Sequence, residues 1–199
     1  MNSENISEQI VKLKQADDNL RAKLLKEESL FEGYHPEMQA LHNRNAEALQ
    51  QIIETIGYPS PAKVGKEASE AAWLIIQHAI GKPEFMKRSA ALLQEAVQQK
   101  QADPVHLAYL QDRIAFFEGR VQLYGTHFDW DEKGDMNLYQ VDDLSKVNDR
   151  RKALGMSPLK EHIKDIQNKV TNEMQGLPID YQKRKLEFEK WRKTVGWIK

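Results

Sequence analysis

Cysteine is absent from the 199-residue chain, so disulfide bonds, thiolate metal sites and cysteine nucleophiles are excluded. An excess of one charge sign is also absent, because 29 lysines and arginines stand against 30 acidic residues. A general binder of nucleic acid or of anionic membranes needs a strong positive excess, so neither partner is expected. With 40% hydrophobic and 30% charged residues, the chain can nevertheless bury a core.

Long hydrophobic runs are absent too. The most apolar stretch, residues 71–80, is interrupted by Gln77 and His78, so no membrane-spanning helix is expected. Residues 1–15 lack the basic start and apolar segment that mark a secretory signal. We therefore expect a cytoplasmic protein that makes no membrane contact.

Glycine and proline divide the chain into helix-length segments. Within them, apolar residues recur at three- and four-residue steps, which is the spacing of one helix face. The expected helices span about residues 3–32, 37–56, 64–80, 83–100, 103–119, 142–154, 158–175 and 178–195. Over residues 126–140, alternation around the turn signal Asp131–Gly134 instead indicates a small β-hairpin. The sequence predicts an all-α fold, a multi-helix orthogonal bundle with one small hairpin, in a single domain over residues 1–199.

Basic residues concentrate near the C-terminus. Residues 150–199 hold 13 lysines and arginines against 6 acidic residues. Four aromatic residues lie among them, namely Tyr181, Phe188, Trp191 and Trp197. Interleaved basic and aromatic residues can hold an anionic polymer. A solvated helix face with inward aromatics explains the same pattern and is the favoured interpretation.

Several polar residues stand where helical periodicity predicts apolar ones. Burying an unpaired polar group costs roughly 2–7 kcal/mol, so each such residue is either paired or functional. Asp17 lies in the apolar stripe of the first helix, and Arg21 follows one turn later, within pairing reach. Asn45 interrupts the second stripe, where a buried amide bonded to nearby backbone is the simpler explanation. Gln77 and His78 end the most apolar helix, where a histidine can serve as general acid or base.

Asp112 and Arg113 interrupt a helix that is otherwise apolar on nearly all sides. Neighbouring helical residues point about 100° apart, so each of the two needs an external partner. His78 and Asp17 are reasonable partners, and an ion network that fixes the core register is an equal alternative. The guanidinium fork of Arg113 suits a carboxylate or a phosphate.

The segment 122–127 is a candidate binding loop. It places Gly125 between the phenol of Tyr124 and the hydroxyl of Thr126. A glycine in that position allows backbone to approach a ligand closely, and loops on rigid helices often carry binding groups.

No metal site is predicted. His127, Asp129 and Asp131 would share one strand face, and the two aspartates resemble the start of a calcium loop. Lys133, however, stands where an oxygen ligand belongs, and Gln140 replaces the closing glutamate. Zinc-protease helix motifs and phosphate-binding glycine loops do not occur in the sequence, so neither a metal nor a cofactor is expected.

Several of these motifs occur together in one protein family. The motifs are Asp17-x-x-x-Arg21, Asn45-x-x-x-Leu49, Gly57-Tyr58-Pro59, Val64-Gly65, residues 71–79 (AAWLIIQHA), Tyr109-Leu110-x-Asp112-Arg113-Ile114, Gly119-x-x-Gln122-x-Tyr124-Gly125-Thr126 and Arg150-Arg151-x-x-Leu154-Gly155-Met156. On these motifs, residues 10–165 resemble the bacterial proteins of domain of unknown function 6624. That family usually has glutamine at the position of His127, so ligand recognition is expected to differ if that glutamine touches a ligand. The family has no assigned activity, so the resemblance implies no reaction, and residues 166–199 form a basic helical extension outside it.

The first functional hypothesis is a binding or interaction module with a polar pocket for a small anionic or peptide-like ligand. Arg21 and Arg113 would hold the ligand, with hydrogen bonds from His78, Gln122 and Tyr124. The predicted lining also includes Asp17, Gln77 and Thr126.

The second hypothesis is an enzyme of hydrolase or lyase type. His78 would act as general base, oriented by Asp112 or Asp17, and Arg113 would stabilise negative charge. Thr126 or a water molecule would be the nucleophile. A third hypothesis has no pocket and places function in contacts with a partner protein.

Overall fold

Proline starts and glycine ends several helices of the chain. Pro36, Pro61 and Pro83 lie in the first turn of a helix, where a missing N–H costs no hydrogen bond. Gly57 and Gly196 follow the last helical residue and donate their backbone N–H groups into the last turn. Local chemistry therefore sets many of the helix ends.

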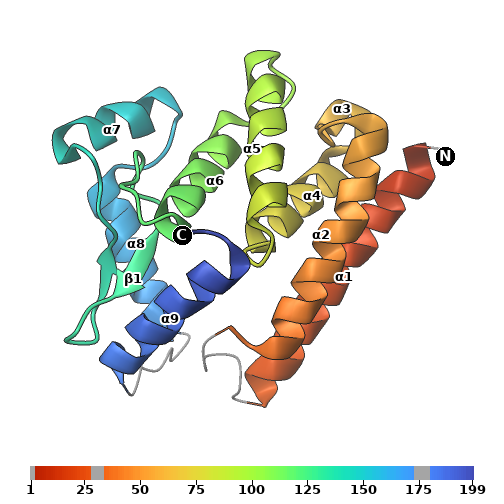
Figure 1. Cartoon of the computed structure of the whole chain (residues 1–199). Helices are drawn as coiled ribbons and strands as arrows, with labels where there is room; N and C mark the ends of the chain where they lie inside the picture. The colour runs from red at the N-terminus through yellow and green to blue at the C-terminus, as the bar shows by residue number, and fades with distance from the viewer. Residues whose placement is uncertain (1–2, 28–33, 173–179) are drawn as a thin grey trace. The chain divides into compact units, whose positions relative to one another are not determined.

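The computed structural model describes residues 3–27, 34–172 and 180–199 (Figure 1). Within these residues it contains nine helices and one two-stranded sheet. The elements are α1 (Ser3–Lys26), α2 (Pro36–Ile56), α3 (Pro61–Val64), α4 (Lys66–His78), α5 (Pro83–Gln98), α6 (Pro104–Phe117), β1 (Phe128–Trp130), β2 (Met136–Leu138), α7 (Leu144–Ala153), α8 (Leu159–Asn172) and α9 (Tyr181–Val195). The prediction of an all-α fold with a small hairpin is confirmed.

The hairpin lies inside the stretch that the sequence predicts. Its strands are antiparallel and pair Phe128 with Leu138 and Trp130 with Met136. The first helix ends at Lys26, earlier than predicted, and its predicted continuation over residues 28–32 lies outside the described residues. The predicted helix end at 175 and helix start at 178 also lie outside them.

Contacts along the chain define two compact units, Met1–His106 and Leu107–Lys199, with the division inside α6. Each unit is described by itself, and the expectation of a single domain stays a prediction. No helix in the described part of the chain has both the length and the apolar character needed to cross a membrane.

In the first unit, α1 contacts α2, α3 and α4, and α4 also contacts α2 and α5. Figure 1 shows α1 and α2 running side by side along their lengths. Ile10 and Leu24 of α1, Leu49 of α2 and Ile75 and Ile76 of α4 are buried. The apolar helix α4 is therefore central to this unit, as its composition predicts.

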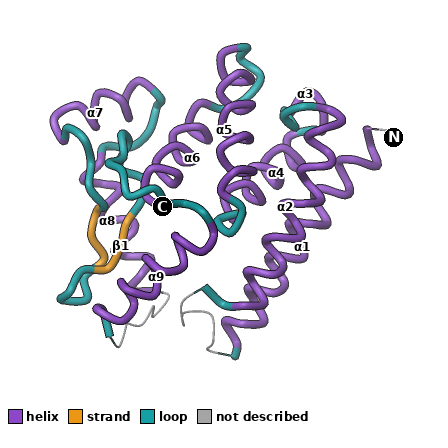
Figure 2. The backbone as a smooth tube through the Cα atoms, in the orientation of Figure 1, coloured by secondary structure: helices purple, strands orange, loops and turns teal. Residues whose placement is uncertain are grey.

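In the second unit, the two short strands pair with each other, β2 contacts α8, and α8 also contacts α7. Figure 2 shows the strands among the loops of this unit. Aromatic rings of α6 pack against the C-terminal segment. Phe116 lies 5.4 Å from Phe188, and Phe117 lies 5.1 Å from Trp197, between ring centroids. Phe188 and Trp197 of the basic segment thus pack inward against α6, as the favoured interpretation of that segment expects.

Candidate functional site

Three ionisable side chains meet in the first unit. Asp17 comes from α1, His42 from α2 and His78 from the end of α4. His78 Nδ1 lies 2.6 Å from Asp17 Oδ2, and His42 Nε2 lies 3.3 Å from Asp17 Oδ1. The imidazole centroids are 5.0 Å apart. We call these three residues the Asp17 cluster, in which one carboxylate bridges two imidazoles.

Burial differs within the Asp17 cluster. Asp17 and His42 are only 2% and 7% exposed, because α1, α2 and α4 contact one another around them. His78 is the last residue of α4, and its side chain is 29% exposed. The cluster therefore has a sealed side, at Asp17 and His42, and an accessible side at His78.

Tyr34 contacts the imidazole of His42 at Nδ1, the ring nitrogen that does not face Asp17. Its hydroxyl lies 2.8 Å from His42 Nδ1, and the two rings are stacked with centroids 5.8 Å apart. Burial, together with the charge of Asp17, raises the pKa of the Tyr34 phenol far above its ordinary value, so the hydroxyl keeps its proton. When this hydroxyl donates to Nδ1, the other ring nitrogen of His42 carries a proton and donates to Asp17.

Asp17 is held as a carboxylate. Burial acts to raise its pKa, but hydrogen bonds and charge interactions with His42 and His78 outweigh that effect. The pKa of Asp17 consequently lies well below its ordinary value. A buried negative charge with two titratable partners is an arrangement that enzymes use for proton transfer.

The other predicted residues of the first unit have different environments. Arg21 is half-buried on α1, but the hydrogen bonds of the Asp17 carboxylate are formed with the two histidines. Gln77 is buried, and its Nε2 atom has no hydrogen-bond partner among the described residues. Asn45 Nδ2 donates to the carbonyl oxygen of Leu13 at 3.0 Å, so the structural interpretation of this residue is confirmed.

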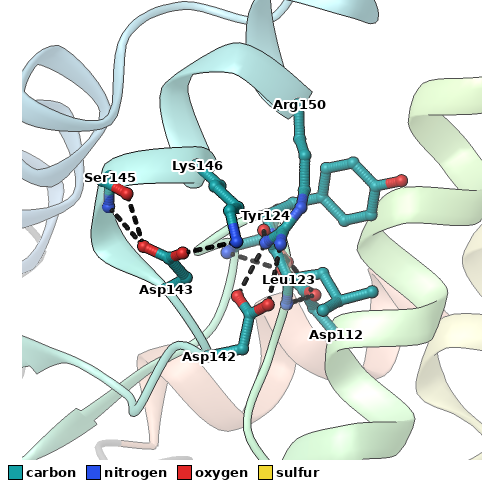
Figure 3. Close-up of polar contacts among 9 residues, drawn as sticks. Asp112, Leu123, Tyr124, Asp142, Asp143, Ser145, Lys146 and Arg150 are labelled. Atoms are coloured by element: carbon teal, nitrogen blue, oxygen red, sulfur yellow. Dashed lines mark hydrogen bonds and ion pairs between the residues drawn. The ribbon is translucent and has the colours of Figure 1, made fainter.

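Asp112 organises a loop of the second unit (Figure 3). Its carboxylate accepts backbone N–H groups from Leu123 at 2.8 Å, Tyr124 at 3.1 Å and Thr126 at 3.1 Å. The Thr126 hydroxyl donates to the same carboxylate at 3.0 Å. Burial raises the pKa of Asp112, and the bonds from the loop counteract that rise. These bonds give Asp112 a structural role, while its predicted catalytic role is a separate matter that stays a prediction.

Gln122 and Tyr124 are also engaged in building this loop. Gln122 is fully buried, and its Nε2 donates to the carbonyl oxygens of His127 and Tyr139 at 2.9 and 2.8 Å. Its Oε1 accepts the backbone N–H of His127 at 2.9 Å. The carbonyl oxygen of Tyr124 accepts from the buried guanidinium of Arg151 at 2.8 Å. The side-chain amide of Gln122 is therefore committed to the loop itself.

Burial lowers the pKa values of both Arg113 and His127 in the second unit. Burial lowers the pKa of Arg113 to about 10, so the guanidinium stays charged at neutral pH. Burial, and secondly the charge of Arg113, hold the pKa of His127 well below its ordinary value. The carboxylate of Asp129, which the sequence places on the same strand face as His127, forms an ion pair with Arg184 at 2.5 Å. Asp131 accepts backbone N–H groups of its own turn.

His42 and Tyr34 are not among the site residues predicted from the sequence. His42 carried a usable signal, because it continues the apolar stripe of α2 between Met38 and Leu49. Tyr34 precedes the helix and follows no periodic pattern, so nothing in the sequence marked it. The Asp17 cluster therefore depends on the tertiary contacts of α1, α2 and α4, which the sequence does not specify.

Comparison with known proteins identifies a family whose function is unknown. The family model described as "Family of unknown function (DUF6624)" matches residues 5–174. No curated protein and no solved structure matches the chain. The matched span contains both the Asp17 cluster and the loop held by Asp112. Since it covers most of the 199 residues, the chain belongs to the DUF6624 family.

Proposed function

We propose that this protein is an enzyme of hydrolase or lyase type in which His78 is the general base. The observation that carries the proposal is the 2.6 Å hydrogen bond from His78 Nδ1 to the buried carboxylate of Asp17. An imidazole whose Nδ1–H donates to a carboxylate has its tautomer and orientation fixed, with Nε2 as the proton-accepting atom. The carboxylate then stabilises the imidazolium that forms when His78 accepts a proton.

His42 and Tyr34 support this pair. A carboxylate held at one oxygen can rotate, whereas Asp17 is held at Oδ2 by His78 and at Oδ1 by His42. Tyr34 in turn fixes the ring of His42 through a 2.8 Å hydrogen bond. The resulting chain of hydrogen bonds positions Asp17 before any substrate binds, which lowers the cost of reorganisation during proton transfer.

Between the two predicted orienting groups, the geometry favours Asp17 over Asp112. Asp17 forms a hydrogen bond with His78, whereas the carboxylate of Asp112, on α6, accepts four hydrogen bonds from the loop of residues 123–126. The sequence suggests a small anionic or peptide-like ligand for a binding module, and we propose the same class as the substrate. Arg21, half-buried one turn from Asp17, is the cation of α1 best placed to hold a negative group.

Hydrolysis of p-nitrophenyl acetate tests the base without knowledge of the natural substrate. His78→Asn and Asp17→Asn are each expected to lower the second-order rate by at least about tenfold, since general-base catalysis contributes on the order of 10²–10⁴. His106→Gln is the matched control. His106 also belongs to the first unit and lies 3.6 Å from a carboxylate, but that carboxylate, Glu70, is exposed. A His78→Asn protein with native circular dichroism and an unchanged rate would refute the assignment.

A further inference from the structure

The Asp17 cluster has the donor set of a transition-metal site. Two imidazoles and one carboxylate each offer one ligand atom, and these atoms lie within 4.8 Å of one another. Across residues 3–27, 34–172 and 180–199, this is the one group of three or more such side chains found so close together. Histidine nitrogen and carboxylate oxygen are donors that Zn²⁺, Fe²⁺ and Co²⁺ accept, and two histidines with one carboxylate leave positions open for water.

The distances come close to those of a tetrahedral ion. Zinc binds nitrogen and oxygen at about 2.0–2.2 Å, which places two ligand atoms about 3.3–3.6 Å apart. His42 Nε2 and Asp17 Oδ1 already lie 3.3 Å apart. His78 Nδ1 lies 2.6 Å from the other carboxylate oxygen, Oδ2, which is shorter than that spacing, so His78 would have to move away from Asp17 to share an ion with it. His78 ends α4 and is the most exposed member of the cluster, so it is the residue best able to move.

Tyr34 is compatible with both arrangements. In the hydrogen-bonded arrangement its hydroxyl donates to His42 Nδ1, and Nε2 donates its proton to Asp17. With an ion on Nε2, the remaining ring proton resides on Nδ1, and the hydroxyl oxygen of Tyr34 accepts it. A hydroxyl both donates and accepts, so the 2.8 Å contact persists in either case and orients the ligand from outside.

We propose that Asp17, His42 and His78 bind one divalent transition-metal ion of the zinc class, and that this ion takes His78 out of proton transfer. An ion on His78 Nδ1 leaves the ring proton on Nε2, so the imidazole has no lone pair with which to accept another. The binding site stands on the geometry of the cluster alone. The inhibitory consequence rests on the proposed function, in which His78 is the base.

Zinc titration of the full chain, freed of metal with EDTA, tests the site. Isothermal calorimetry is expected to give one Zn²⁺ per chain, with elemental analysis confirming the stoichiometry. Asp17→Asn and His42→Gln should each weaken binding by at least about tenfold, and Tyr34→Phe by about tenfold through loss of the outer hydrogen bond. His106→Gln should bind as the parent does. Equal zinc affinity in the parent, Asp17→Asn and His42→Gln proteins would overturn the proposal.

Cobalt substitution provides a measurement that needs no variant. Co²⁺ held by two imidazoles and a carboxylate in a four- or five-coordinate site gives visible absorption bands far stronger than those of the hexa-aquo ion. The parent chain is expected to develop these bands up to one equivalent of Co²⁺, and Zn²⁺ should abolish them by displacement. A spectrum that stays that of the aquo ion would refute the site even if a variant fails to fold.

The ester assay separates failure of this proposal from failure of the proposed function. Suppression of p-nitrophenyl acetate hydrolysis by one equivalent of Zn²⁺ supports both. Zinc binding that raises the rate would retain the site but overturn the inhibitory role and His78 as the base. Absence of zinc binding, with hydrolysis still dependent on His78, would overturn the metal site and leave the base in place.

Discussion

Replacing Asp112 by alanine removes the acceptor of a whole loop in the second unit. The carboxylate accepts backbone N–H groups from Leu123, Tyr124 and Thr126 and also the Thr126 hydroxyl. Alanine keeps the helix propensity of α6 but offers none of these donors a partner. The loss of stability should therefore come from the loop and not from the helix.

The loss of unfolding free energy in Asp112→Ala follows from the number of hydrogen-bond donors that are left unpaired. Leu123 is 40% exposed, so water can reach its part of the loop, and it is left out of the count. The N–H groups of Tyr124 and Thr126 remain, both in partly buried bonds, and each donor left unpaired costs about 1–3 kcal/mol. Asp112→Ala should lower the free energy of unfolding by at least about 2 kcal/mol. Asp112→Asn, which keeps one acceptor oxygen, should lose roughly half as much.

Asp131 provides the matched control. It also accepts backbone N–H groups, from Lys133 and Asp135, together with the side-chain amide of Asn137, but on the exposed turn of the hairpin. Water replaces the carboxylate there, so Asp131→Ala should be much less destabilising than Asp112→Ala. Urea unfolding followed by tryptophan fluorescence and by circular dichroism measures both. Equal losses in the two variants would show that burial of the donors does not set the loss of stability, which would refute the reasoning.

Three further predictions concern the same unit. Gly125→Ala should destabilise by about 1–3 kcal/mol more than Gly155→Ala, because both have a positive φ but only at Gly125 would a Cβ meet a side chain, at 2.7 Å. Differential scanning calorimetry measures that difference, and equal melting temperatures would contradict it. His127→Gln should flatten the loss of stability between about pH 6.5 and 5, where each pH unit costs the parent up to about 1.4 kcal/mol. The depressed pKa of His127 means that only the unfolded chain gains this proton as the pH falls, and unfolding titrations at several pH values measure the slope. Arg151→Lys should cost about 2–3 kcal/mol in urea unfolding, because the guanidinium donates to both Tyr124 and Ser157 carbonyls and an ammonium cannot reproduce that fork.

Periodicity and turn chemistry predicted most of the fold. The spacing of apolar residues identified the long helices, and the turn signal Asp131–Gly134 identified the hairpin. The single turn α3 was missed, because four residues contain no period to detect. Gly65, with φ of 79°, separates it from α4 and lies inside the stretch that the sequence assigned to one helix.

The site was only partly predictable, for a different reason. Polar residues in apolar stripes can be recognised from the sequence, and that criterion selected both Asp17 and His78. It could not decide which helices lie side by side, so Asp17 and Asp112 remained equal partners for His78. The stripe criterion also applies to His42, which occupies a buried position of α2. Pairing is a tertiary property, and only the contacts of α1, α2 and α4 revealed it.

The two buried aspartates show why burial alone does not identify a functional residue. Asp17 and Asp112 are 2% and 1% exposed, and each carboxylate is well supplied with donors. The donors to Asp112 are backbone amides and a hydroxyl, which keep their protons at every physiological pH. The donors to Asp17 are imidazoles, which can accept or release a proton and can bind a metal ion. A carboxylate among permanent donors is fixed in one state, which suits the structural role of Asp112. A carboxylate among exchangeable donors has several accessible states, which is why the proposed proton transfer is assigned to Asp17.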